Sequence, residues 1–179
     1  PEQRAIDIID QTRLPHTLHR VRVATLEAAA HAIRAMQVRG APLIGATAAY
    51  GLALALDFEA SDRSLAEAAA LLRSTRPTAV NLHWALARME AVLAPLPPAE
   101  RCAAAWAEAA AIADEDVAQN TAIGAHGLAL WREQIVPRGD MLDVMTHCNA
   151  GWLATVDGGT ALAPVYAAHD AGILVHVWV

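Results

Sequence analysis

The sequence predicts an α/β protein in two parts, a mostly helical region followed by a parallel βαβ unit. The first part is expected to be helical because the chain is 55% hydrophobic and only 4% aromatic, with alanine and leucine dominating its long segments. The second part is expected because a strand-like run, a helical run and another strand-like run follow one another within about 40 residues. We place the boundary between the parts near Pro137.

Short strands are predicted to open the first part. Residues 6–10 and 18–23 read as strands on either side of a turn, which indicates a hairpin or small sheet. Thr25 is placed to cap a helix that runs through Ile33 and Met36 to Val38, and Glu27 favours its first turn.

Four further helices are predicted before the boundary. The segment 41–56 carries no charge and is expected to be a buried central helix, shorter than the roughly 20 residues that a membrane span needs. Residues 61–64 read as a turn before helices at 65–73 and 79–93, and a proline-rich break precedes a long helix over 99–133. Gly124 and Gly127 either weaken that helix or allow another backbone to approach it closely.

The second part begins with a buried strand at 141–146. A glycine-rich loop follows, then a helix over 160–171 that Thr160 is placed to cap, Gly172 as its C′ residue, and a strand at 173–179. Because the sequence starts on proline and stops on an apolar run, we expect it to be the front part of a longer protein.

Composition excludes several classes of function. A net charge of −6 with no basic stripe argues against a nucleic-acid surface. The two cysteines, Cys102 and Cys148, are too few for a disulfide framework. No targeting segment is recognised. We expect a soluble, cytoplasmic protein that binds a small molecule and neither nucleic acid nor membrane.

Two helix starts carry an arginine where the helix dipole disfavours it. Arg39 precedes Gly40, Ala41 and Pro42 at the start of the apolar helix, and Arg76 precedes the helix that begins near residue 79. A bound anion would make both arginines favourable, since free N–H groups at a helix start also attract anions. The alternatives are a solvated arginine at each start, or an arginine paired with a nearby carboxylate.

Cys148 follows the first strand of the βαβ unit, where ligands bind in open α/β sheets. A cysteine there is expected to be partly exposed and near helix N-termini, which lowers a thiol pKa; the alternative is a buried apolar cysteine. Cys102 lies on a predicted helix and is expected to be structural. The histidines are scattered, with no pair at a metal-ligand spacing.

Five segments resemble methylthioribose-1-phosphate isomerases, enzymes of methionine salvage and so of amino-acid biosynthesis. They occur in the order that the family has and run through the whole chain. The family shares its fold with regulatory subunits of a eukaryotic initiation factor and with ribose-1,5-bisphosphate isomerase. The matching segments are Asp10-Gln11-Thr12-Arg13-Leu14-Pro15, Val38-Arg39-Gly40-Ala41-Pro42-Leu43-Ile44-Gly45, Arg76-Pro77-Thr78-Ala79-Val80-Asn81-Leu82, Thr146-His147-Cys148-Asn149-Ala150-Gly151 and Gly159-Thr160-Ala161-Leu162.

The resemblance implies an N-terminal mostly helical domain with a small β-sheet over residues 1–137, followed by the start of a Rossmann-like parallel α/β domain over 138–179. It implies that Arg39, Gly40, Ala41 and Arg76 bind the substrate. It also implies that Cys148 is the active-site cysteine, thought to stabilise the transition state.

The implied reaction is the conversion of 5-methylthioribose 1-phosphate to 5-methylthioribulose 1-phosphate, with no metal or organic cofactor. The family's second catalytic residue, an aspartate, falls beyond Val179, so residues 1–179 alone are expected to be inactive. Gly158 and His83 stand where relatives often have larger aromatic residues. Two alternatives stay open: a non-catalytic regulatory or ligand-binding subunit, and an isomerase of another ribose 1-phosphate derivative. We expect a homodimer.

Overall fold

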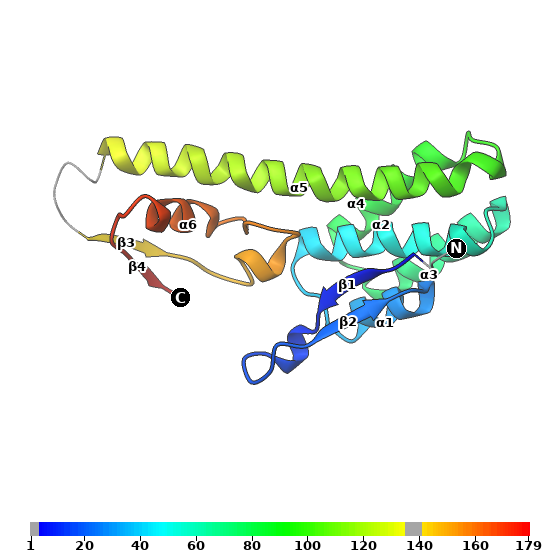
Figure 1. Ribbon diagram of the computed structural model, residues 1–179, viewed down its shortest axis with the longest axis horizontal. Helices are drawn as coiled ribbons and strands as arrows, with labels where there is room; N and C mark the ends of the chain where they lie inside the picture. The colour runs from blue at the N-terminus through cyan, green and yellow to red at the C-terminus, as the bar shows by residue number, and fades with distance from the viewer. Residues whose placement is uncertain (1–3, 135–140) are drawn as a thin grey trace. The chain divides into compact units, whose positions relative to one another are not determined.

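The computed structural model describes residues 4–134 and 141–179. Its contacts divide the chain into two compact units, Pro1–Ala113 and Asp114–Val179. The first unit contains a β-hairpin and a group of helices. The second contains two paired parallel strands and the helix that connects them along the chain (Figure 1). The predicted fold class, mostly helical with a small sheet and then a parallel α/β unit, is confirmed.

The hairpin consists of β1 (Ile6–Ile9) and β2 (Arg20–Val23), which pair antiparallel with Ile6 opposite Val23. Between them lies the short 3-10 helix η1 (Gln11–Arg13), capped by the side chain of Asp10. Both strands therefore lie where the sequence predicted them.

Helix α1 (Leu26–Arg34) begins as predicted, because the Thr25 hydroxyl accepts a hydrogen bond from the N–H of Ala28 at 3.1 Å. The prediction that it continues to Val38 is wrong. The chain turns at Met36, whose φ is 57°, and Val38 is fully buried outside any helix. A buried apolar residue in a loop has the same sequence signature as the last turn of an amphipathic helix.

Helix α2 (Ala41–Phe58) is the centre of the first unit. It packs against α1, α3 (Asp62–Thr75) and α4 (Val80–Leu93). Gly51 permits this closeness, since a Cβ there would lie 2.8 Å from Ala29 and 3.3 Å from Leu72. The helix is long and apolar enough to be tested as a membrane span, yet 67% of it is buried inside the protein. A core helix has this pattern.

The predicted turn at 61–64 is instead the start of α3. The Ser61 hydroxyl accepts a hydrogen bond from the N–H of Ser64 at 3.1 Å, which is an N-cap rather than a turn between elements. Helix α4 begins at Val80 with Ala79 as its N-cap residue, close to the predicted start.

Helix α5 (Pro98–Gln134) confirms the long helix predicted over 99–133. The division between the two compact units falls within it, after Ala113. The predicted domain boundary at 137 lies in the segment 135–140, outside the described residues, and stays a prediction.

The second unit contains β3 (Leu142–Met145), α6 (Ala163–Asp170) and β4 (Val175–Trp178), with β3 and β4 parallel. The predicted burial of β3 is only partly right: Leu142 is 3% exposed but Met145 is 83% exposed, because β3 pairs with a single strand among the described residues. This pair and its connecting helix confirm the predicted βαβ unit.

Two details of α6 test the sequence analysis. Thr160 does not cap α6. Instead, the Ala163 N–H donates a hydrogen bond to the Thr160 carbonyl at 3.2 Å, which closes a turn ahead of the helix. The helix therefore begins at Ala163, three residues later than predicted. Gly172 is the C′ residue as predicted, with φ 77°. The N–H groups of Gly172 and Ile173 bond to the carbonyls of His169 and Ala168, both at 2.9 Å, which is a Schellman ending.

Gly124 and Gly127 let another backbone approach α5, the second of the two predicted roles. A Cβ on Gly124 would lie 3.1 Å from the Ala163 carbonyl oxygen, and one on Gly127 would lie 2.5 Å from the Pro164 ring. The C-terminal half of α5 is thus packed closely on the start of α6, inside the second unit.

Candidate functional site

The predicted site residues fall into two groups, one in each compact unit, and each group is described by itself. The first group surrounds the start of α2. Gly40 is the N-cap residue with φ 93°, a conformation that favours glycine. No side chain among the described residues caps this helix. Its first-turn N–H groups therefore keep their capacity to bind an anion.

The start of α4 lies against the start of α2. A Cβ on Gly45 would be 3.0 Å from the Asn81 carbonyl oxygen, so the two helices touch backbone to backbone within about a turn of their N-termini. Like α2, α4 has no side-chain cap among the described residues. The positive ends of two helix dipoles thus lie close together, and both favour a negatively charged group nearby.

Arg39 lies directly before Gly40, the N-cap residue of α2, and Arg76 lies three residues before Ala79, the N-cap residue of α4. Arg39 is exposed, and Arg76 is half-buried as the C-cap residue of α3. Within residues 4–134 and 141–179, neither arginine has a carboxylate at salt-bridge distance. The alternative that each arginine pairs with a nearby carboxylate thus finds no support among the described residues. Their convergence on one anion stays a prediction.

His83 holds the turn that carries Arg76. Its Nε2 lies 2.8 Å from the Pro77 carbonyl oxygen, and because that oxygen can only accept, Nε2 carries the proton in this contact. The sequence analysis noted His83 only as a departure from its relatives. The missed signal was its spacing, since position 83 lies one turn into the helix that follows Pro77.

The second group surrounds Cys148, three residues after the end of β3. β3 is extended by the N–H of Thr146, which bonds to the Trp178 carbonyl at 2.9 Å. Cys148 is exposed and has φ 68°, an uncommon conformation for a residue with a side chain. The structure thus places this thiol just beyond the carboxyl end of a parallel strand, as the sequence predicted.

The loop of Cys148 is packed directly on a second loop. A Cβ on Gly159 would be 2.1 Å from the Gly151 carbonyl carbon, so only glycine fits there. The buried Thr155 hydroxyl accepts a hydrogen bond from the Gly159 N–H at 3.1 Å. These contacts fix the backbone on the carboxyl-terminal side of the thiol's loop.

Asp116 ties this second loop to α5. Its Oδ2 accepts a hydrogen bond from the Val156 N–H at 2.8 Å, and the buried Asn120 donates to its Oδ1 at 3.2 Å. Removal from water raises the pKa of Asp116 above its ordinary value. The sequence analysis gave Asp116 no role, because its partner Val156 lies 40 residues away.

The hydroxyl of Thr146 is buried and has no hydrogen-bond partner among the described residues. Leaving such a group unpaired costs about 1–3 kcal/mol. It lies two positions before Cys148, so an unused donor and acceptor is available at the thiol's loop.

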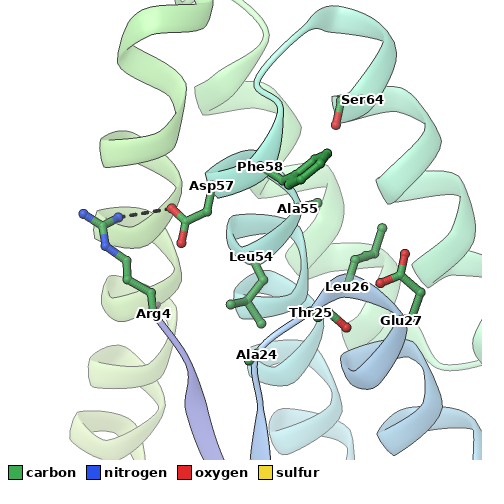
Figure 2. Close-up of a pocket in the computed structure, with 10 residues that line it drawn as sticks. All are labelled: Arg4, Ala24, Thr25, Leu26, Glu27, Leu54, Ala55, Asp57, Phe58 and Ser64. Atoms are coloured by element: carbon green, nitrogen blue, oxygen red, sulfur yellow. Dashed lines mark hydrogen bonds and ion pairs between the residues drawn. The ribbon is translucent and has the colours of Figure 1, made fainter. Parts of the chain in front are cut away.

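A pocket of about 570 Å³ in the first unit contains none of the predicted site residues. Figure 2 shows its lining, with the Arg4–Asp57 ion pair on one side and Leu26, Glu27 and Ser64 on the other. The Oδ1 of Asp57 also accepts hydrogen bonds from Cys102 Sγ at 2.8 Å and from Trp106 Nε1 at 2.9 Å.

The Asp57 hydrogen bond raises the pKa of the Cys102 thiol, so this cysteine resists ionisation. That fits the structural role predicted for it. Within the part of the chain that the structure describes, no group of three His, Cys, Asp or Glu side chains is placed to share a metal ion.

The first unit thus presents two uncapped helix starts with an arginine ahead of each, and the second unit presents an exposed thiol beyond a parallel strand. Residues 37–179 match the Initiation factor 2 subunit family. The chain belongs to that family, as the match covers most of its length.

Named relatives extend the comparison. The chain is 81% identical over 179 residues to "Methylthioribose-1-phosphate isomerase" of Dechloromonas aromatica (strain RCB), covering 100% of this chain and 49% of that protein. It is 61% identical over 175 residues to the protein of the same name in Methylorubrum populi, covering 98% of this chain and 48% of that protein. The chain therefore spans about half the length of these relatives.

Two solved structures have the same fold. The crystal structure of 5-methylthioribose 1-phosphate isomerase from Pyrococcus horikoshii OT3 superposes with a TM-score of 0.85 at 37% identity, covering 97% of this chain and 49% of that one. The crystal structure of the translation initiation factor eIF-2B, subunit delta, from A. fulgidus superposes with a TM-score of 0.80 at 38% identity, covering 96% of this chain and 50% of that one.

Proposed function

We propose that the full-length protein is an aldose–ketose isomerase that converts 5-methylthioribose 1-phosphate to 5-methylthioribulose 1-phosphate in methionine salvage. The names of its relatives support the substrate. The observation that carries the proposal is the contact between Gly45 and Asn81, because it brings together two uncapped helix starts, each preceded by an arginine.

In this proposal the phosphate is bound between Arg39, Arg76 and the first turns of α2 and α4. Backbone N–H groups from Gly40 and Ala41 supply hydrogen bonds, and the two guanidinium groups supply charge and orientation. Such binding energy holds the sugar in one pose, which raises the rate of a reaction at a neighbouring carbon.

The chemistry requires proton movement at a sugar that has no free aldehyde. The ring of an aldose 1-phosphate must open before the carbonyl moves from carbon 1 to carbon 2, and an acid–base group assists both steps. We assign Cys148 the stabilisation of the transition state. A second acid–base residue, an aspartate, is expected from a part of the full-length protein outside residues 1–179. A cis-enediol and a direct hydride shift both remain open routes.

The reactive intermediate needs a site from which water is excluded. In the first unit our candidates for an apolar wall are Leu43 and Ile44 from the start of α2, and in the second unit the candidate is Trp152, which follows the thiol's loop. Ile44 is 4% exposed and Trp152 is 48% exposed, so Trp152 has surface available for a methylthio group.

A second candidate function is a non-catalytic regulatory or ligand-binding subunit. The similarity to the initiation-factor subunit favours it, since that structure matches nearly as well as the isomerase. An isomerase acting on another ribose 1-phosphate derivative is a third. Catalytic turnover distinguishes a regulatory subunit, which has none, from either isomerase. Comparison of sugar phosphates as substrates distinguishes the methylthioribose 1-phosphate isomerase from an isomerase of another ribose 1-phosphate derivative.

Domain organisation, cellular location and oligomeric state are also part of the proposal. We propose that the second unit is the start of a Rossmann-like domain, that the helical domain ends near residue 137, and that the full-length protein is a cytoplasmic homodimer. Light scattering of the full-length protein measures the oligomeric state directly.

Replacing Arg76 by alanine in the full-length protein is expected to raise KM for methylthioribose 1-phosphate by about 10- to 100-fold. A hydrogen bond to a charged group is worth about 1.5–3 kcal/mol. Arg63→Ala is the matched control, since Arg63 is 83% exposed and pairs only with Glu67 one turn away. Steady-state kinetics decides: an unchanged KM in Arg76→Ala removes this residue from the phosphate site.

A further inference from the structure

Asp10 is a buried charge that the proposed chemistry does not use. It is 4% exposed. Its Oδ1 accepts hydrogen bonds from the Thr12 N–H at 3.0 Å and the Thr12 hydroxyl at 2.6 Å, and its Oδ2 accepts one from Gln37 Nε2 at 3.2 Å. The bonds from Thr12 lower the pKa of Asp10 below its ordinary value, so it stays ionised at neutral pH. A buried carboxylate is costly unless it is bonded in this way.

Gln37 is held from two directions by the turn that follows β1. Its side chain donates to Asp10, and its backbone carbonyl accepts a hydrogen bond from the Gln11 N–H at 2.9 Å. Residues 10–11 thus clamp a residue that lies 27 positions further along the chain and only two positions before Arg39.

The segment between α1 and α2 has few other restraints. Met36 has φ 57° and Gly40 has φ 93°, and a non-glycine residue in that region costs about 1–3 kcal/mol unless its surroundings hold it. Val38 is fully buried, and its N–H bonds to the Ala32 carbonyl at 3.3 Å. The clamp on Gln37 and the burial of Val38 therefore fix the path of the backbone into Arg39.

We propose that Asp10 is a positioning residue for the phosphate site: through Gln37 it fixes the backbone that carries Arg39 and Gly40 to the start of α2. This inference rests on the proposed function of Arg39. A guanidinium that meets phosphate oxygens through paired N–H groups needs a defined orientation. Loss of the clamp therefore weakens substrate binding without touching the reacting carbons.

The test is a pair of opposite changes at the two ends of one hydrogen bond, made in the full-length protein. Gln37→Glu presents a carboxylate to the Asp10 carboxylate and so breaks the bond, whereas Asp10→Asn alone keeps one, because the Gln37 amide can rotate and accept from the new N–H with its oxygen. The double variant Asp10→Asn/Gln37→Glu restores it with donor and acceptor exchanged.

Gln37→Glu is expected to raise KM for methylthioribose 1-phosphate by about five- to tenfold, with kcat within about twofold, and Asp10→Asn alone is expected to leave KM within about twofold of the parent. In Gln37→Glu the constant for competitive inhibition by inorganic phosphate should rise by the same factor as KM. The double variant should return both constants to within about twofold of the parent. Gln37 is only half-buried, so Gln37→Glu keeps the test available if Asp10→Asn does not fold.

Arg39→Ala separates failure of this inference from failure of the proposed function. If Arg39→Ala leaves KM unchanged, the phosphate site itself is wrong and the inference falls with it. If Arg39→Ala raises KM but Gln37→Glu does not, or if the double variant is no better than Gln37→Glu, the inference alone is overturned. In an Arg39→Ala background, Gln37→Glu is expected to add no further rise in KM.

Discussion

Replacement of Cys148 by serine in the full-length protein is expected to lower kcat by about 10²–10⁴-fold while KM stays within about threefold. The exposed thiol lies beyond the carboxyl end of β3, on a loop packed against Gly159. Serine keeps the size of the side chain and removes the sulfur, so the loop should persist. The measurement is steady-state kinetics with methylthioribose 1-phosphate.

Cys102→Ser is the matched control for this change. The Cys102 thiol donates a hydrogen bond to Asp57 in the first unit, and a serine hydroxyl can donate the same hydrogen bond. We expect its kcat to stay within about twofold of the parent. Equal losses in the two variants, or a loss only in Cys102→Ser, would contradict the assignment of Cys148.

Replacement of Arg101 by methionine is expected to lower the free energy of unfolding of the full-length protein by about 2–4 kcal/mol, through loss of its hydrogen bonds to backbone carbonyls. Arg101 is 3% exposed. Its guanidinium donates to the carbonyls that end α4 and to the loop before α3, and its charge is paired with Asp62 at 2.5 Å. The carbonyl partners are Leu93 at 3.0 Å, Leu96 at 2.9 Å, Ala60 at 3.1 Å and Ala94 at 3.3 Å.

Methionine fills much of the same space but removes the donor from the carbonyls of Leu96, Ala60 and Ala94, which is the source of the expected loss. The Leu93 carbonyl keeps the Leu96 N–H as a donor at 3.1 Å. Urea unfolding of the full-length protein measures it. Arg63→Met is the control, because its pairing with Glu67 is exposed and such pairs contribute little to stability. A loss below about 1 kcal/mol for Arg101→Met would show that other groups or water satisfy the carbonyls.

Local patterns were sufficient to predict most of the fold. The Thr25 cap, the uncharged α2 and the glycine after α6 each depend on residues within a few positions, and each was confirmed. The errors occurred where one sequence pattern has two structural outcomes. Val38 is apolar and buried in a loop rather than in a helix, and Ser61 caps a helix rather than forming a separate turn.

The candidate site stands out in the sequence where its residues conflict with the helix dipole. Arg39 and Arg76 stood out because a cation is unfavourable at an empty helix start. The residues that support the site were not predictable, because their partners lie far away in the sequence. Asp10 meets Gln37 across 27 positions and Asp116 meets Val156 across 40, and no local pattern indicates such a pairing.

The central claim is that the full-length protein is a catalyst for a phosphorylated sugar rather than a subunit that only binds one. The most direct test incubates the purified full-length protein with methylthioribose 1-phosphate and follows carbons 1 and 2 by NMR. We predict loss of the aldose signals and growth of the ketose signals at a rate proportional to enzyme, with that rate abolished in Cys148→Ser. Tight binding of the sugar phosphate without any ketose would contradict the claim and identify a regulatory subunit instead.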